Sequence, residues 1–136
     1  MIRLAATALA LSAIATPAIA ADPITGRWVT EGGEGVVAID RCGPSICGRL
    51  ARVMKAPAGA PTTDANNPDK ALRNRPLVGT PILLGFTDAG EDWRGTIYDP
   101  KSGKSYRSIV LAQGDRLSVK GCIAVFCRTQ NWRRVP

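Results

Sequence analysis

The sequence contains no histidine, and this absence removes several classes of chemistry at once. Histidine is the side chain that most often serves as the general base for a serine or cysteine nucleophile. The chain also lacks a Gly-x-Ser-x-Gly segment, which surrounds the nucleophile in many hydrolases. We therefore expect no nucleophilic catalysis of these kinds.

Long apolar runs are also missing, except at the N-terminus. In MIRLAATALALSAIATPAIA (1–20), a single charge, Arg3, precedes a short apolar run that ends in small residues. This pattern is typical of a secretory signal peptide, and the run is shorter than the about 20 residues needed to span a bilayer. We expect cleavage after Ala20, leaving residues 21–136 in the periplasm or secreted. No other segment predicts a membrane span, and the first cysteine, Cys42, is too far away for a lipid-anchored start.

The four cysteines form two equally spaced pairs, Cys42 with Cys47 and Cys122 with Cys127. In an oxidising compartment an even number of cysteines indicates disulfide bonds, and four cysteines allow three connectivities. We favour local pairing within each pair, because each closes a hairpin and contributes about 2 kcal/mol. A four-cysteine zinc site is the alternative that this spacing permits. Export and the lack of histidine disfavour it, so we expect no metal and no other cofactor.

Basic residues outnumber acidic ones, 18 Lys and Arg against 11 Asp and Glu, for a net charge of +7. Loss of Arg3 with the signal peptide would leave +6. In a cytosolic protein this balance suggests nucleic acid. Outside the cytosol we expect no nucleic-acid partner, and an anionic envelope component such as a lipid, a glycan or an acidic ligand instead. A moderate net charge also keeps a small protein soluble without any partner.

Apolar and polar residues alternate along most of the remaining chain. The segments with this two-residue period are rich in β-branched and aromatic residues and are bounded by turn residues: 26–30, 35–42, 47–54, 80–86, 92–99, 105–112, 116–122 and 127–135. Short turns between successive strands imply antiparallel neighbours in a meander. Closing the sheet removes its exposed edges. We therefore predict one all-β domain (21–136), an eight-stranded antiparallel meander β-barrel.

The connection from Met54 to Gly79 is far longer than the usual median of about 4–6 residues. Within it we expect one short helix near 68–74, between the third and fourth strands, with Asn67 as its N-cap. We assign four polar residues to structuring this loop: Asp64, Asn66, Asn67 and Asp69. Calcium is an alternative for their oxygens, but the glycine and the distant glutamate of an EF-hand loop are missing. The connection is either a lid or a plug.

Two arginines of this connection, Arg73 and Arg75, are candidates for binding a carboxylate or phosphate group. Alternatively they pair with Asp64, Asp69 or Asp99 and pin the loop over an open barrel end, which we slightly favour for each arginine. The other candidate ligand-binding residues lie on later strands: Trp93, Tyr98, Lys104 and Tyr106.

The two ends of the mature chain resemble those of lipocalin-like (calycin) barrels. Gly26-Arg27-Trp28 begins the first strand and Trp132-Arg133-Arg134 lies on the last. In such barrels the indole of a Gly-x-Trp packs against an Arg or Lys of the last strand. The resemblance implies that Trp28 closes one barrel end under Arg133 or Arg134, in a cation–π contact of about 0.5–2 kcal/mol.

A wider resemblance covers nearly the whole mature chain. ADPITGRWVTEG, CGPSICGRL, TDANNPDKALRNRPLVGTPIL, YDPKSGKSY and GCIAVFCRTQNW together are similar to domain of unknown function 2147 (DUF2147), a family of small exported bacterial proteins. The resemblance implies a calycin-like barrel and export. No enzymatic activity is established for the family, so it supplies no function.

Three functions remain open. An eight-stranded barrel is either filled by side chains or holds one small ligand, so the first is binding of a small amphipathic or hydrophobic, lipid-like molecule in the cell envelope. The second is a non-enzymatic interaction module whose basic surface docks on an anionic envelope polymer or a partner protein. The third is a hydrolase that uses paired carboxylates such as Asp64 with Asp69 or Asp99. We rank them in this order, and expect a monomer that is not an enzyme.

Overall fold

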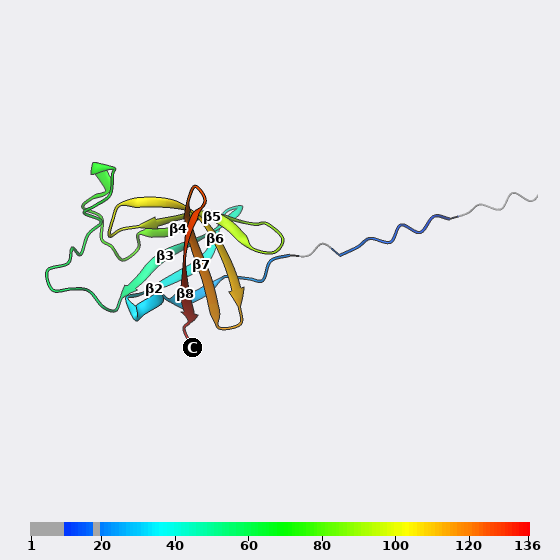
Figure 1. Cartoon of the computed structure of the whole chain (residues 1–136), viewed down its shortest axis with the longest axis horizontal. Coiled ribbons are helices and arrows are strands. Elements are labelled where there is room, and N and C mark those ends of the chain that lie inside the picture. The colour runs from blue at the N-terminus through cyan, green and yellow to red at the C-terminus, as the bar shows by residue number, and fades with distance from the viewer. Residues whose placement is uncertain (1–9, 18–19) are drawn as a thin grey trace, which may run out of the picture.

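The structure is a computed structural model that describes residues 10–17 and 20–136. In this part of the chain eight strands close into one barrel, in which each strand pairs antiparallel with the next and the last pairs with the first (Figure 1). The strands are β1 (Gly26–Val29), β2 (Gly35–Cys42), β3 (Ser45–Val53), β4 (Pro81–Asp88), β5 (Trp93–Asp99), β6 (Lys104–Gln113), β7 (Arg116–Ile123) and β8 (Phe126–Arg134). The predicted all-β meander barrel is confirmed, with every strand boundary within two residues of its predicted place.

The predicted signal peptide lies partly outside the described residues, and its described segment 10–17 forms no helix or strand. The strands, the core cluster and both disulfide bonds all lie within residues 21–136. All of these elements therefore lie after the predicted cleavage point at Ala20.

Alternate strand residues face the barrel interior and form its core. The cluster consists of Ile24, Trp28, Val37, Ile39, Ile46, Ile82, Leu83, Phe86, Val110, Ala112, Leu117, Val119 and Trp132. Two glycines let neighbouring side chains approach the sheet closely. A Cβ on Gly48 would lie 2.9 Å from Val37 Cγ1, and a Cβ on Gly95 would lie 2.6 Å from the Phe86 ring. This part of the interior is filled with side chains.

Because the strands alternate in direction, the loops divide between two barrel ends. The closed end carries the N-terminal segment 20–25 and the turns at 43–44, 89–92 and 114–115. The open end carries the 3-10 turn η1 (Glu31–Gly33), the long connection 54–80 with the 3-10 turn η2 (Lys70–Leu72), and the turns at 100–103 and 124–125. Figure 1 shows the connection looping out on the side of the barrel opposite the N-terminal segment.

The Trp28 indole lies at the closed end, wholly buried, and donates a hydrogen bond to the Ile24 carbonyl at 2.9 Å. The Arg134 guanidinium carbon lies 4.1 Å from the centre of its ring. A Cβ on Gly26 would lie 2.8 Å from Arg134 Nη1, so the glycine makes room for this cation–π contact. Arg133, the other residue considered for the contact, is exposed and pairs with Val29 in the sheet.

The N-terminal segment crosses the closed end and seals it. The backbone N–H of Ala21 lies 3.2 Å from both carboxylate oxygens of Asp88, and the Trp93 indole donates to the Asp22 carbonyl at 2.8 Å. These bonds join the start of the barrel to β4 and β5.

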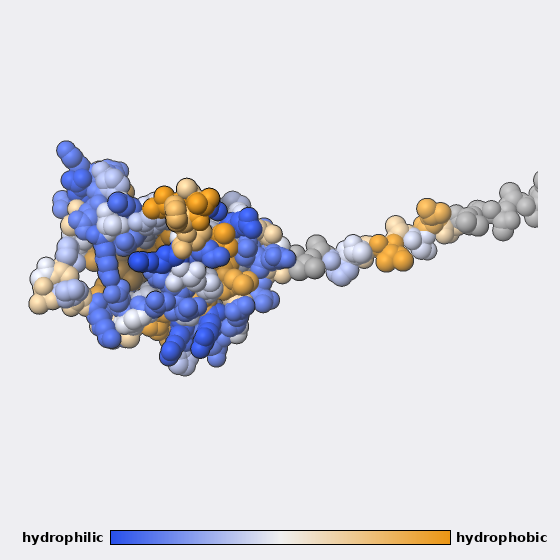
Figure 2. All heavy atoms as spheres, viewed as in Figure 1, coloured by the Kyte–Doolittle hydropathy of each residue, from blue (hydrophilic) through white to orange (hydrophobic). Residues whose placement is uncertain are grey.

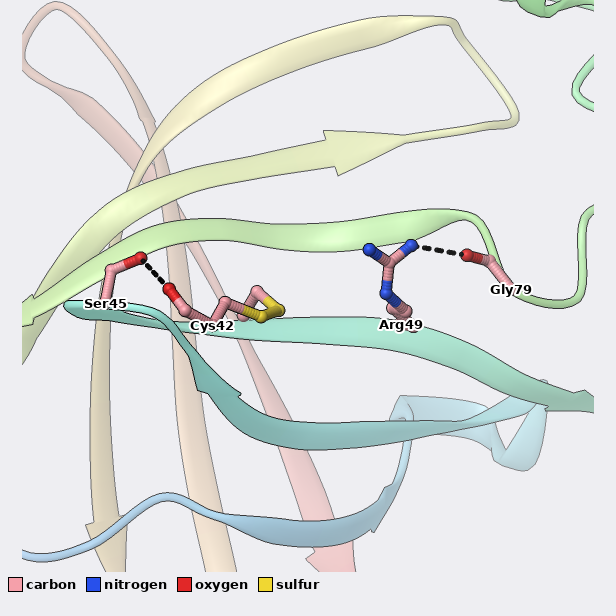
Figure 3. The surroundings of a disulfide bond; sticks show 5 residues. Cys42, Ser45, Arg49 and Gly79 are labelled. Atoms are coloured by element: carbon pink, nitrogen blue, oxygen red, sulfur yellow. Dashed lines mark hydrogen bonds between the residues drawn. A yellow bond between two sulfur atoms is a disulfide. The ribbon is translucent and has the colours of Figure 1, made fainter.

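Each predicted local disulfide is present. Cys42–Cys47 closes the β2–β3 hairpin at the closed end, where the Ser45 hydroxyl donates to the Cys42 carbonyl at 3.3 Å (Figure 3). Cys122–Cys127 closes the β7–β8 hairpin at the open end. A disulfide therefore braces one hairpin turn at each end of the barrel.

Candidate functional site

Asp64, in the long connection, is the centre of the most extensive side-chain network of the open end. Its carboxylate is wholly buried. Oδ1 accepts from the Tyr98 hydroxyl at 2.5 Å, and Oδ2 accepts from Asn67 Nδ2 at 2.8 Å and from Arg75 Nε at 2.9 Å. Arg75 Nη2 completes an ion pair at 2.8 Å. Because Tyr98 belongs to β5, these four residues, the Asp64 cluster, pin the connection to the barrel wall.

The Asp64 cluster shifts the pKa values of both its acidic members. Burial by itself raises the pKa of Asp64, but the hydrogen bonds from Tyr98, Asn67 and Arg75 and the Arg75 charge outweigh it, so the net pKa falls below its ordinary value of 3.8. Burial, together with the hydrogen bond and charge of Asp64, raises the pKa of Tyr98 to about 12. The cluster therefore holds a carboxylate and a neutral phenol across the whole neutral range.

The predicted helix near 68–74 is shorter than expected: it is one 3-10 turn over Lys70–Leu72. Its N-cap is Asp69, not Asn67, and the Asp69 side chain accepts from the Ala71 N–H at 3.0 Å. Asp69 has extended backbone (φ −81, ψ 110), which prevents a helix from starting at Pro68. Asn67 instead donates its amide to Asp64, and its side-chain oxygen accepts from the Asp69 N–H at 2.8 Å.

Asn66 fixes the connection at a second point. Its amide donates to the Lys101 carbonyl at 2.9 Å, in the turn between β5 and β6. In the same turn Gly103 has a left-handed φ of 70°, and a Cβ there would overlap the Asn66 carbonyl oxygen. Only glycine satisfies both conditions, so the connection and the turn pack backbone to backbone.

The other arginines around the connection also bind its backbone. Arg73 Nε donates to the Asn67 carbonyl at 2.7 Å. Arg49, on β3, donates to the Gly79 carbonyl at 3.1 Å, where the connection rejoins the sheet (Figure 3). Arg73 and Arg75 therefore both face their own connection, one bound to a carbonyl and the other to a carboxylate.

The six residues predicted to bind a ligand do not come together. Arg75 and Tyr98 belong to the Asp64 cluster, Arg73 lies beside it, and Trp93 donates to the N-terminal segment at the closed end. Lys104 is exposed at the start of β6. Tyr106 faces the barrel interior at the open end, and Lys104, two residues before it on β6, lies on the same face of that strand.

The interior face at the open end begins with Ile97 and Tyr106, which lie directly opposite each other on β5 and β6. A Cβ on Gly121 of β7 would lie 3.6 Å from Ile97 Cγ2 and 3.7 Å from Tyr106 Cβ, so all three residues share this face. Gly121 is opposite Arg128, and Val119 is opposite Gln130. Since residues opposite each other point to the same side of the sheet, Arg128 and Gln130 belong to the same interior face.

This face, which we call the inner wall (Ile97, Tyr106, Gly121, Arg128 and Gln130), is open to solvent. Its first three residues are half-buried, and Arg128 and Gln130 are exposed. The reason is the short contact between β1 and β8, which pair only at Trp28–Arg134 and Val29–Arg133. From these pairs toward the open end, the edge of β8 that faces β1 has no paired strand. The inner wall is therefore accessible from the open end.

A hollow of about 450 Å³ lies where β1 ends and β8 continues. It is lined by Val29, Thr30, Glu31, Gly32, Gly33, Arg116, Asn131, Trp132 and Arg133. Arg116 and Arg133 lie directly opposite each other across β7 and β8, and both also line a neighbouring hollow of about 270 Å³. Like charges in this position repel each other. In the part of the chain that the structure describes, neither arginine forms an ion pair.

Sequence reasoning missed Ile97, Gly121, Arg128 and Gln130 of the inner wall, as well as Arg116. The two-residue period of the sequence could have found two of them. Trp132 faces the core, so Gln130 and Arg128, two and four positions before it, must lie on the same face of the strand. Within residues 10–17 and 20–136, no group of three or more Cys, Asp or Glu side chains is arranged to hold a metal ion. No helix in these residues is both long and apolar enough to cross a membrane.

Comparisons with known proteins agree with this architecture. A solved structure from Helicobacter pylori, the protein HP1028, described as belonging to the lipocalin family, superposes with a TM-score of 0.72 at 19% sequence identity over 84% of each chain. This likeness shows a lipocalin-like fold. No curated protein matches the chain. The model of the family described as "Uncharacterized protein conserved in bacteria (DUF2147)" matches residues 26–134, from the first strand of the barrel to the last. The chain therefore belongs to the DUF2147 family.

Proposed function

We propose that the protein is exported to the cell envelope, where it binds a small amphipathic or hydrophobic molecule against the inner wall. The observation that carries this proposal is that Ile97 and Tyr106 face the interior of a closed barrel and yet remain partly accessible to solvent. Apolar surface with a few polar groups is the usual composition of small-molecule sites. The lipocalin-like fold and the two disulfides support a ligand-binding barrel outside the cytosol.

The packing favours a site at the open end over one deep inside the barrel. Trp28, Phe86 and Trp132 occupy the interior toward the closed end and are almost completely buried. An apolar chain would therefore lie across Ile97 and Tyr106. Arg128, exposed on the same face, is placed to bind a carboxylate or phosphate head group.

Filling the inner wall tests this proposal. A Cβ on Gly121 would make only ordinary van der Waals contacts, 3.6 Å from Ile97 Cγ2 and 3.7 Å from Tyr106 Cβ, and the residue has no left-handed φ, so Gly121→Leu is expected to fold and to occupy the site. Binding of a fluorescent fatty-acid analogue should weaken at least about tenfold, the loss expected when one pocket contact is blocked. Ser118→Leu adds the same side chain to the same strand, three residues away and on the other face, and should bind like the wild type. Equal binding by the Gly121→Leu and wild-type proteins would place the ligand elsewhere.

A second candidate function rests on Arg116 and Arg133. Two guanidiniums directly opposite each other, bordering a hollow of about 450 Å³, are arranged to bind an anionic envelope polymer. Heparin is a suitable probe, and its binding should weaken steeply with salt. Arg116→Gln should reduce it severalfold, whereas Arg41→Gln, an equal charge change on β2 that does not border the hollow, should not. If both variants lose binding equally, only net charge is involved.

The geometry does not support the hydrolase hypothesis. Asp64 is wholly buried and both its oxygens accept hydrogen bonds within the Asp64 cluster. Asp69 caps η2, and Asp99 accepts from the Lys101 N–H at 3.0 Å and the Ser102 hydroxyl at 2.9 Å. Each carboxylate therefore accepts hydrogen bonds that stabilise its own loop or turn, and we do not propose a reaction.

A further inference from the structure

The turn between β7 and β8 exposes a group of apolar side chains, residues 123–126, which we call the apolar tip. Ile123 is 62% exposed, Val125 87% and Phe126 79%. Figure 2 shows them as a compact hydrophobic cluster that rises above the surface, flanked by hydrophilic residues. Large exposed apolar groups of this kind mark binding surfaces.

The apolar tip is held in place by its surroundings. The Cys122–Cys127 disulfide joins the two strands immediately below it. Arg107 Nη2, on β6, donates to the Ala124 carbonyl at 3.0 Å. Ala124 itself has a left-handed φ of 52°, the only residue other than glycine with a positive φ in the described part of the chain. Such local strain persists where the surrounding structure enforces it and is common at binding sites.

Basic residues surround the tip. Arg107 contacts its backbone, Arg128 follows Cys127 on β8, and Lys104 is exposed at the start of the neighbouring strand β6. Asp99, paired with Lys104 in the sheet, is the nearest acidic residue on β5, and its carboxylate accepts two hydrogen bonds from its own turn. The charge around the tip is therefore positive.

We propose that the apolar tip inserts into the interface of an anionic lipid bilayer while Arg107, Arg128 and Lys104 contact lipid phosphates. Apolar side chains that enter the acyl boundary, combined with basic residues at the level of the headgroups, are how peripheral proteins bind such membranes. An anionic glycan would neutralise the basic residues but would leave Val125 and Phe126 in water. A bilayer satisfies both. This docking shares Arg128 with the inner wall, but it rests on the apolar tip, which is not part of that wall, and so does not require a ligand to be bound there.

Vesicle co-sedimentation of oxidised residues 21–136 tests the proposal. We expect binding to mixed phosphatidylglycerol–phosphatidylcholine vesicles and much weaker binding to phosphatidylcholine alone. Val125→Ser with Phe126→Ser should weaken binding at least about tenfold, since two apolar side chains no longer leave water. Leu84→Ser, at an exposed apolar residue of the barrel wall, should leave it unchanged. Lys104→Gln should weaken binding about fivefold, and Arg41→Gln, at the closed end, should not.

A second readout reports insertion directly. With Phe126→Trp, lipids brominated in their acyl chains should quench the new fluorescence. The buried Trp28 and Trp132 and the closed-end Trp93 should remain unquenched. Equal binding by the double serine variant and the wild type would overturn the proposal in favour of general charge attraction. Absence of binding to every vesicle would overturn it too. Concentration-dependent dimerisation abolished by the double serine variant would instead identify the tip as a contact between copies of this chain. Loss of fatty-acid binding in Gly121→Leu with intact vesicle binding would separate the two proposals.

Discussion

Replacing Asp64 with alanine removes the acceptor on which the Asp64 cluster depends. Three donors from two parts of the chain converge on this carboxylate: the Tyr98 hydroxyl, the Asn67 amide and the Arg75 guanidinium. Tyr98 and Asn67 are themselves buried, so water does not replace the lost acceptor for either. The variant therefore leaves polar groups unpaired as well as removing bonds.

The expected loss of stability follows from how deeply each of the three donors is buried. An unsatisfied buried donor costs about 1–3 kcal/mol, and here there are two. The Arg75 side chain is 29% exposed, so water compensates part of its loss, and we assign it no more than about 1 kcal/mol. These terms add to about 2–7 kcal/mol. We take the middle of this range, about 3–5 kcal/mol, which is the loss observed when one partner of a buried pair is removed. For a barrel of this size the melting temperature should fall by about 12–20 °C.

Thermal and urea unfolding of the oxidised protein measure this loss. Asp92→Ala is the matched control, because Asp92 pairs with Arg94, whose side chain is 62% exposed, and its loss should cost less than about 1 kcal/mol. A double-mutant cycle with Tyr98→Phe should give a coupling energy of about 1–2 kcal/mol. If Asp64→Ala costs no more than Asp92→Ala, the connection is not pinned by Asp64 and the cluster makes no net contribution.

Three further predictions concern the Asp64 cluster and the apolar tip. Because the pKa of Asp64 is lowered in the folded protein, its contribution to stability is present above about pH 3.8 and is lost as the pH falls through the folded value, so Asp64→Asn should flatten the acid limb of a stability–pH curve. Because the pKa of Tyr98 is raised to about 12, its contribution is complete below about pH 10 and is lost as the pH rises toward 12. Tyr98→Phe should therefore remove both this alkaline loss and the tyrosinate absorbance that titrates near pH 12. Ala124→Gly relieves the left-handed backbone of the apolar tip and should raise the free energy of unfolding by about 0.5–1 kcal/mol in urea melts, whereas Ala124→Val should lower it.

The strands were predictable because local signals agree along most of the chain. Along β6 buried side chains alternate with more exposed ones, and turn residues bound the strand. Apart from β3 and β4, successive strands are joined by short turns, and each strand pairs with the next one in the sequence. A meander therefore needs almost no long-range information, and the two local disulfides add the same kind of constraint.

The site was less predictable because it depends on contacts between distant residues. Asp64 and Tyr98 are 34 positions apart, and nothing local indicates that the Tyr98 hydroxyl reaches the connection. The extended backbone of Asp69, which moves the cap from Asn67 to Asp69, also has no local sequence signal. One error was avoidable: Trp93 and Tyr98 are five residues apart on one strand, so the two-residue period already places them on opposite faces.

The two ends of the barrel differ in what their unusual features achieve. At the closed end two of them have a structural explanation: Gly26 admits Arg134 over Trp28, and the N-terminal segment binds β4 and β5. The pair Arg116 and Arg133 at the same end is the exception. At the open end, the exposed apolar tip and the left-handed Ala124 both oppose solubility or stability. The Cys122–Cys127 disulfide closes so short a loop that it contributes only about 2 kcal/mol, which does not explain why the turn it braces is apolar. Features that folding does not explain are expected where a protein meets its partner, and this is why we assign both ligand binding and membrane docking to the open end.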